Sequence, residues 1–197
     1  MQPARQAFTR ESADARRSDL IEATAACLAE HGLAGTNVRA ICAKAGVSPG
    51  LLRHYFDGID DLVAATYQAT SDRMDAIFAA AVASARPEPR ARLLAYLTAS
   101  FRAPVTDPEL LGAWTAFWAL ARSDARMADI HAESYAGYRA RLGELLTACG
   151  ARDAERLAIM LTAMVDGLWL ELSLDAASFG AEAAAAMIEK AVAALLD

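Results

Sequence analysis

The sequence TNVRAICAKAGVSPGLLRHY, residues 36–55, decides the fold of this chain. Its first half places apolar or small side chains at helical spacing, on Val38, Ile41, Cys42 and Ala45. This pattern predicts a helix with one apolar face. Thr36 stands where the N-cap of that helix would lie. Gly46 follows the last apolar position, where a left-handed backbone is easiest for glycine.

The second half of this stretch predicts another short helix. Ser48 is expected to cap it, and Pro49 to occupy its first turn, where the missing N–H costs nothing. Leu52 and Tyr55 continue the buried face. Two short helices joined by a tight turn that contains glycine form a helix-turn-helix, whose second helix enters the major groove of DNA. An ordinary corner between two helices is the alternative.

Composition indicates an all-helical protein. The chain has 197 residues, of which 55% are hydrophobic, with only 6 Pro and 11 Gly. This length suits one or two small domains with a sizeable core. No uncharged apolar run of about 18 residues occurs, so no membrane span is expected. Residues 1–14 lack the apolar core of a signal peptide and are expected to form a polar arm.

Cysteine and histidine indicate neither a disulfide framework nor a metal site. Cys27 and Cys42 fall on apolar helical faces and are interpreted as buried thiols in a reducing cytoplasm, with a redox sensor as the alternative. His31 and His131 have no partner at ligand spacing, so no metal ion or other cofactor is predicted.

Charge is distributed unevenly along the chain. The formal net charge is −6, which by itself argues against a nucleic-acid partner. Residues 1–57 nevertheless hold seven Arg or Lys against six Asp or Glu, whereas residues 58–197 hold twelve against nineteen. A local positive face is what DNA phosphates meet. DNA affinity is therefore expected to depend on a few placed residues and on dimerisation.

Residues 16–62 resemble the DNA-binding domain of TetR-type transcriptional repressors. The resemblance rests on Leu20-Ile21-Glu22-Ala23, Gly32, Thr36-Asn37-Val38, Ala45-Gly46-Val47-Ser48-Pro49-Gly50 and His54-Tyr55-Phe56. Residues 113–119, AWTAFWA, and 166–170, DGLWL, are similar to the ligand-domain signatures of the choline-responsive BetI subgroup. The resemblance implies an all-α cytoplasmic regulator of about nine helices, with a DNA-binding domain in 1–58 and an effector-binding and dimerisation domain in 59–197.

Periodicity and proline positions place the helices. They are expected at about 14–31, 60–85, 90–102, 108–122, 124–149, 153–174 and 181–196, besides the two of the helix-turn-helix. The inner face of the first helix is marked by Leu20, Thr24, Cys27, Leu28 and His31. The helix at 60–85 is expected to link the two domains. One of its faces is traced by Leu62, Thr66, Ala69, Arg73, Ala76 and Ala80.

The candidate DNA contacts are Thr36, Arg39, Lys44, Ser48, Pro49, Gly50, Arg53, His54 and Tyr55. Arg53 can offer two donors to guanine. The resemblance implies that Thr36, His54 and Tyr55 contact phosphates. Ile59 stands where the family often has a lysine, which removes one usual phosphate contact and predicts a shallower salt dependence.

The candidate effector contacts are Trp114, Phe117, Trp118, Asp166 and Trp169. The first three stand at i, i+3 and i+4, so they can share one helix face. Aromatic rings bind quaternary ammonium groups through cation–π attraction, and a carboxylate adds charge. The resemblance makes choline or a related quaternary ammonium compound the expected effector. Tyr96, Phe101, Tyr135 and Tyr138 are further possible lining residues, and simple core packing is the alternative.

The last two helices are expected to form a homodimer interface of four helices. The residues proposed for it are Ala158, Leu161, Thr162, Val165, Leu168 and Leu172, with Ala183, Ala184, Met187, Ile188, Ala191 and Leu195. Packing inside one chain is the alternative. An enzyme is not expected, because there is no Gly-rich phosphate loop after a strand and no GxSxG elbow. A TetR-type regulator with a different effector (another amine, an acyl-thioester, a metabolite or a drug) remains open.

Overall fold

The structure is a computed structural model that describes residues 10–175 and 179–196, so most of the predicted N-terminal arm lies outside it. This part of the chain is all-α, with no strand. Its elements are α1 (Arg10–Gly35), α2 (Val38–Ala45), α3 (Pro49–Tyr55), α4 (Ile59–Ser84), α5 (Pro89–Thr98), the 3-10 turn η1 (Ala99–Phe101), α6 (Pro108–Ala121), α7 (Ala125–Ala148), α8 (Ala154–Leu174) and α9 (Ala181–Leu196).

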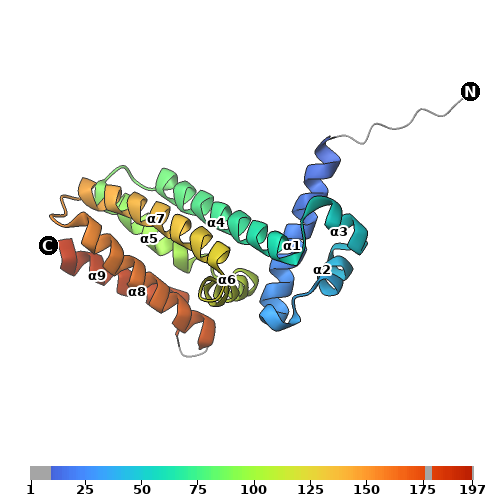
Figure 1. Cartoon of the computed structure of the whole chain (residues 1–197). Helices are drawn as coiled ribbons and strands as arrows, with labels where there is room; N and C mark the ends of the chain where they lie inside the picture. Colours follow the sequence, from blue (N-terminus) through green and yellow to red (C-terminus); the bar gives the residue numbers. More distant parts are fainter. Residues whose placement is uncertain (1–9, 176–178, 197) are drawn as a thin grey trace, which may run out of the picture.

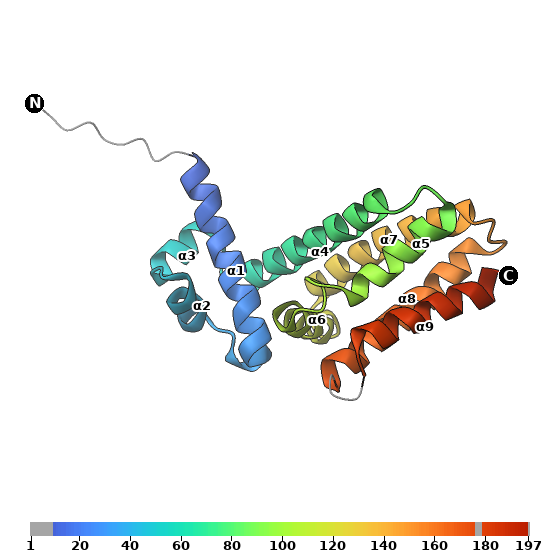
Figure 2. The same ribbon diagram turned by 180° about the vertical axis from the view of Figure 1, so that it is seen from behind.

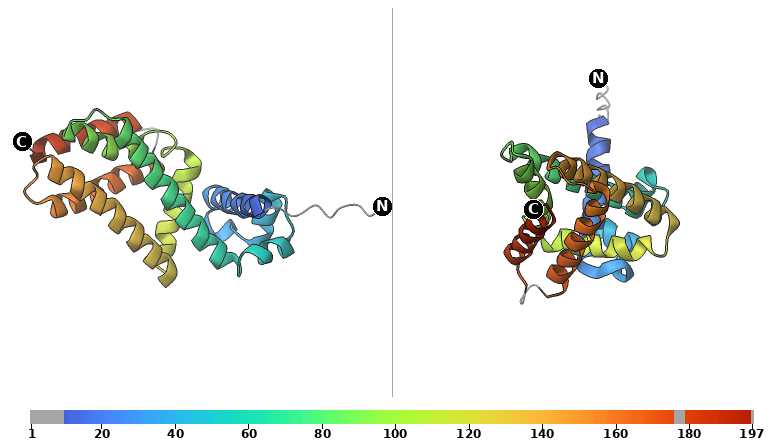
Figure 3. Two further views of the ribbon diagram at one scale, coloured as in Figure 1. Left: turned by 90° about the horizontal axis from the view of Figure 1, so that it is seen from above. Right: turned by 90° about the vertical axis from the view of Figure 1, so that its left-hand side faces the viewer.

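The molecule is elongated, with two ends joined by α4. Figure 1 shows α1, α2 and α3 at one end and a bundle of α5 to α9 at the other. Seen from behind, α5 and α9 run side by side, and α8 lies next to α9 (Figure 2). From above, α4 runs from the helix-turn-helix into the bundle, and α6 lies beside α1 (Figure 3).

A small core holds the helix-turn-helix end together. It is built from Leu20, Ala23, Cys27, Ile41, Cys42, Leu52, Phe56 and Leu62. The prediction that Cys27 and Cys42 are buried is confirmed. His31, in contrast, is exposed and was wrongly assigned to the inner face of α1. The helix turns away near it, because Gly32 has a positive φ of 61° that kinks the helix.

The face of α4 traced from the sequence is buried only in its first half. Arg73, Ala76 and Ala80 are exposed. The buried side instead carries Tyr67, Thr70, Ser71, Met74, Phe78 and Val82. The two stripes differ by about one residue in register. Burying large apolar side chains removes more apolar surface from water than burying alanine, so the bulkier stripe faces the bundle.

The crossing of α1 and α6 joins the two ends of the molecule tightly. A Cβ atom on Gly112 would lie 2.9 Å from the Cα atom of Ala29. Contacts that short do not occur between real side chains and a backbone, so the close approach of the two helices depends on glycine at this position.

The α8 face chosen for the dimer interface belongs mainly to the core of the chain. Five of its residues are buried within the chain, namely Ala158, Leu161, Thr162, Val165 and Leu172. Leu168 is partly buried against the same core. On α9, Ala184 and Ile188 are also buried, whereas Ala183, Met187 and Leu195 are exposed. The helical spacing was correct, but spacing alone does not distinguish a face within one chain from a face between chains.

Candidate DNA-binding face and effector cavity

The first helix of the helix-turn-helix is capped by Asn37, not by Thr36 as predicted. The Asn37 side chain accepts a hydrogen bond from the Ala40 amide at 3.0 Å, and its backbone is extended. The Thr36 hydroxyl instead donates to the Gly32 carbonyl at 2.8 Å and so ties the end of α1 to the start of α2. Asparagine is a stronger N-cap residue than threonine, and here the two stand next to each other.

The turn and the capping of α3 agree with the prediction. Gly46 is left-handed, with φ 65° and ψ 32°, and the Val47 amide donates to the Cys42 carbonyl at 3.0 Å. Ser48 accepts a hydrogen bond from the Leu51 amide at 3.3 Å, and Pro49 opens the helix. Leu52 anchors α3 in the small core, so the side chains on its other side are turned outward.

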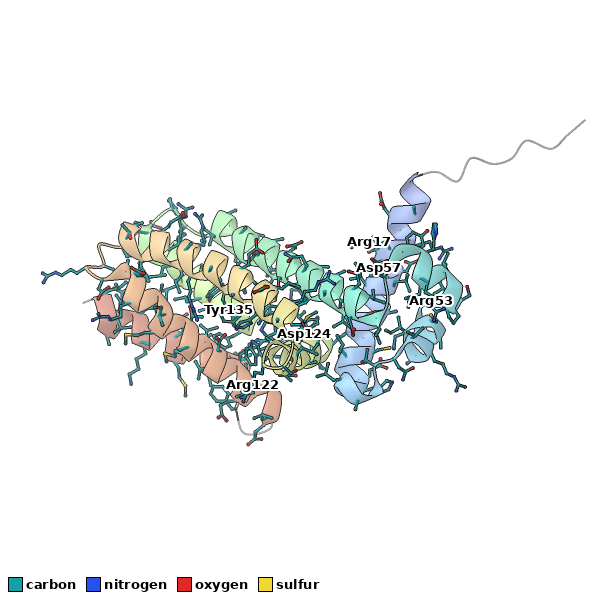
Figure 4. The ribbon with its side chains drawn as sticks, viewed as in Figure 1. Arg17, Arg53, Asp57, Arg122, Asp124 and Tyr135 are labelled. Atoms are coloured by element: carbon teal, nitrogen blue, oxygen red, sulfur yellow. The ribbon has the colours of Figure 1, made fainter. Side chains whose placement is uncertain are left out.

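The outward side of this motif carries most of the predicted DNA contacts. Arg39, Ser48, Pro49, Gly50, Arg53 and His54 are exposed. Tyr55 is half-buried, with its ring centroid 5.0 Å from that of His54. Figure 4 shows Arg53 on α3 at the end of the molecule that is remote from the bundle. Exposed basic groups of both α2 and α3, Arg39 and Arg53, therefore belong to this motif.

Lys44 has a partner within the chain. Its ammonium lies 2.7 Å from the Glu30 carboxylate of α1, and this contact raises the pKa of Lys44. Both groups are partly exposed, so the pair is weak and can exchange for a phosphate. Its role in binding DNA stays a prediction.

The bundle encloses a cavity of about 50 Å³ between α4, α6, α7, α8 and η1. Its aromatic walls are Phe78, Trp114, Tyr135, Tyr138 and Trp169. Its polar groups are Asp75, Ser100, Ser134, Thr162 and Asp166. The Trp114 and Trp169 rings meet edge to face, with centroids 6.3 Å apart. A concave, aromatic site with a few polar groups is typical of a small-molecule site.

The five predicted effector residues do not share one wall. Trp114, Asp166 and Trp169 line the cavity. Phe117 is fully buried and stacks on Tyr67 at 4.4 Å, so it belongs to the core. Trp118 lies behind Tyr135, and its indole N–H donates to the Tyr135 hydroxyl at 3.1 Å. A helix turns by about 100° per residue, so aromatic groups at i, i+3 and i+4 spread over an arc of about 100° and need not all face one cavity.

The four further residues proposed to line the effector site are also divided between the cavity wall and the surrounding core. Tyr135 and Tyr138 line the cavity. Tyr96 stacks behind Tyr138 at 5.0 Å and donates to its backbone carbonyl at 3.2 Å. Phe101 is buried in the core.

Asp166 is a partly buried acidic group on the cavity wall. The Tyr135 hydroxyl donates to its Oδ1 atom at 3.1 Å. Burial raises the pKa of Asp166 to about 6, although the Tyr135 hydrogen bond and the nearby Arg139 charge oppose this rise. The carboxylate is therefore mostly ionised at pH 7, and among the described residues it forms no ion pair. A cation in the cavity would neutralise it.

Sequence reasoning missed Asp75 and Met74, which line the cavity from α4. The face traced from the sequence lies about one residue away in register. The run Met74-Asp75-Ala76-Ile77-Phe78 contains two large apolar residues at i and i+4, Met74 and Phe78, and this was the available signal.

Two family comparisons match most of the chain. Residues 20–66 match the bacterial regulatory proteins of the tetR family, and residues 89–197 match the C-terminal domain of BetI-type transcriptional repressors. The HTH-type transcriptional regulator BetI 2 from Chromohalobacter salexigens is 37% identical, and the match covers 81% of this chain and 78% of the relative.

Solved structures of transcriptional regulators share the fold of this chain. A candidate transcriptional regulator from Pseudomonas aeruginosa PAO1 is 42% identical, with a TM-score of 0.83, and the match covers 93% of this chain and 91% of the other. Another, from Saccharomonospora viridis and solved in complex with choline, has the same TM-score of 0.83 over 91% and 96% of the two chains, but is 14% identical and so shows the shared fold alone. The relatives and the helix-turn-helix geometry together show that the chain belongs to the TetR family of DNA-binding transcriptional regulators, with a C-terminal domain of the BetI type.

Proposed function

We propose that this regulator is a homodimeric repressor that binds a palindromic operator in the bacterial cytoplasm and responds to a quaternary ammonium cation such as choline. The observation that carries the effector proposal is the cavity, in which Trp114, Trp169, Tyr135 and Tyr138 surround the carboxylate of Asp166. Each ring that faces a cation contributes about 0.5–2 kcal/mol, and the carboxylate balances the charge. A carboxylate without an ion pair, inside an aromatic cavity, favours a cationic ligand over a neutral one.

The relatives support the same class of effector. The curated relatives carry the BetI name, and one solved neighbour holds choline. Because a fold can serve many ligands, the argument for this chain rests on its own residues.

The homodimer is proposed through the outer face of α8 and part of α9. Large apolar side chains are exposed there, namely Ile159, Met160, Leu170, Leu174, Met187 and Leu195. Ala163 and Gly167 lie on the same exposed side of α8 and let a second helix approach closely. By length and composition α8 could also cross a membrane. Its other face, however, packs in the bundle and carries Asp166 into the cavity, which favours a partner helix over lipid.

The dimer proposal has a direct test. Leu170→Glu places a charge in the apolar face and should convert the dimer to a monomer in sedimentation equilibrium. Leu33→Glu, at an exposed leucine of α1 and not of α8 or α9, is the control and should remain dimeric. A wild-type chain that sediments as a monomer at micromolar concentration would refute the proposal.

The proposed contacts with DNA lie on α2 and α3. Arg53 is proposed to read a base edge, and Arg39, Lys44 and His54 are proposed to contact phosphates together with Thr36, Ser48 and Tyr55. Pro49 and Gly50 bring the backbone close to the groove. Two such faces in a dimer would meet half-sites about one DNA turn apart, near 34–36 Å.

The experiment that tests the function is an electrophoretic shift with DNA from the region upstream of the gene, with and without choline. We expect a shift that choline alters, and saturable quenching of tryptophan fluorescence by choline, because two of the three tryptophans line the cavity. A shift without any choline effect or quenching would remove choline and leave the DNA-binding assignment intact. A dimer that gives no shift at low salt would contradict the proposed operator.

A further inference from the structure

A second, more open cleft lies on the other side of Tyr135 and Asp166. It measures about 500 Å³ and is bounded by α6, α7 and α8. Its walls include Trp118, Arg122, His131, Tyr135, Arg139 and Asp166. Figure 4 shows Arg122 and Tyr135 close together where these helices meet.

The cleft has an excess of positive charge. Arg122 ends α6, and Arg139 comes from the middle of α7. Within residues 10–175 and 179–196, neither arginine forms an ion pair. The Arg139 guanidinium lies 5.5 Å from the centre of the Tyr135 ring, which holds it over the cleft wall. The nearby Asp124 carboxylate is used as the cap of α7, where it accepts the Met127 amide at 2.9 Å.

His131 adds a neutral donor. The Tyr67 hydroxyl lies 2.9 Å from His131 Nδ1, and this bond joins α4 to α7. Burial and the Arg139 charge lower the pKa of His131, so the ring is neutral at pH 7. When Tyr67 donates to Nδ1, the ring proton is on Nε2, which is then a hydrogen-bond donor.

The one carboxylate on the cleft wall is already engaged. Asp166 accepts the Tyr135 hydroxyl, which in turn accepts the Trp118 indole N–H. Two arginines and a histidine therefore face the cleft. Among the described residues that line it, the only acid is Asp166, and its carboxylate is already hydrogen-bonded to Tyr135. A guanidinium without an acidic partner binds carboxylate or phosphate oxygens with two parallel hydrogen bonds.

We propose that this cleft is an oxyanion site, in which Arg122 and Arg139 bind a carboxylate or a phosphate group. The wall that separates it from the aromatic cavity is one layer of side chains, Tyr135 and Asp166. A cation on one side and an anion on the other would polarise the same hydrogen bonds. The oxyanion has two possible sources: the acidic group of a zwitterionic effector that reaches across this wall, or a free anion.

The test uses the full-length wild-type protein and the double variant Arg122→Gln, Arg139→Gln. Arg86→Gln, an exposed arginine in the connection between α4 and α5, is the matched control. Melting temperature and tryptophan fluorescence are measured against inorganic phosphate and acetate at constant ionic strength. We expect a saturable response of the wild type and the control, and a dissociation constant raised about tenfold or more in the double variant.

Glycine betaine and choline then separate the two sources. If the effector supplies the oxyanion, the double variant should lose affinity for betaine and keep its affinity for choline. If the anion is free, the double variant should lose phosphate or acetate alone. Equal anion responses in all three proteins, or no response of the wild type to phosphate, acetate or glycine betaine, would overturn the site. The choline cavity has its own test, the choline titration of the wild-type protein.

Discussion

Replacing Asp166 by Asn should make the protein more stable and less able to bind a cation. The amide oxygen of asparagine can still accept the Tyr135 hydroxyl, which now lies 3.1 Å from Oδ1. Only the negative charge is removed, with almost no change in volume. The gain in stability and the loss of cation binding have one cause. The free protein holds a carboxylate away from water that only a bound cation would neutralise.

The magnitude follows from the pKa of this group. Burial raises it from the ordinary value of 3.8 to about 6, so the folded protein holds the proton more tightly than the unfolded chain. The cost of ionisation is therefore absent below about pH 4, grows between about pH 4 and pH 6, and is complete above that. The upper limit of this cost of ionising Asp166 is about 3 kcal/mol. Because the group retains some solvent contact, we expect a gain of about 1–2 kcal/mol for the variant at pH 7.

The assay is urea unfolding of wild type and variant at about pH 7.5 and about pH 4, with the linear extrapolation that yields the free energy of unfolding. Glu171→Gln, on the exposed side of the same helix, is the matched control and should change stability by less than about 0.5 kcal/mol at either pH. The gain for Asp166→Asn should be present at the higher pH and disappear at the lower one.

The binding measurement uses the same pair of proteins. Wild-type affinity for choline should fall about tenfold from pH 7 to pH 5, since only about a tenth of Asp166 is then ionised. The variant should bind more weakly at pH 7 and should lack this pH dependence. A variant that is less stable than wild type at pH 7.5, or a wild-type affinity that is the same at both pH values, would refute the reasoning.

Four further substitutions test other parts of the structure. Gly112→Ala should lower the free energy of unfolding in urea by about 1–3 kcal/mol, because its Cβ would clash with the α1 backbone at Ala29. Gly137→Ala, with open space around it on α7, should instead raise the free energy of unfolding by about 0.5–1 kcal/mol. Phe117→Ala should cost about 3–5 kcal/mol, since the ring is fully buried; a loss of less than about 1 kcal/mol would contradict its place in the core. Arg53→Ala should relax base preference at one operator position by about 1–3 kcal/mol in competition binding, and unchanged specificity would show that it reads no base.

The DNA-binding end was largely readable from the sequence. Its signals are local: a glycine after the last helical turn, Ser48 and Pro49 at the start of α3, and apolar residues three or four apart. Each of these acts through the backbone within a few residues. The local errors are two. Thr36 in place of Asn37 as the cap exchanged two neighbouring residues that both have a capping side chain, and His31 was placed on the inner face of α1 although it is exposed.

The effector end needed the tertiary structure. The sequence determined that the helices are amphipathic and aromatic-rich, and it identified Trp114, Trp169 and Asp166 as a group. Which of the aromatic residues face a cavity depends on how far each helix is rotated about its axis, and that rotation is decided by packing with helices distant in the chain. Packing placed Phe117 in the core, turned Met74 inward, and set Arg122 and Arg139 around a second cleft, because close packing over the whole bundle selects one rotation for every helix.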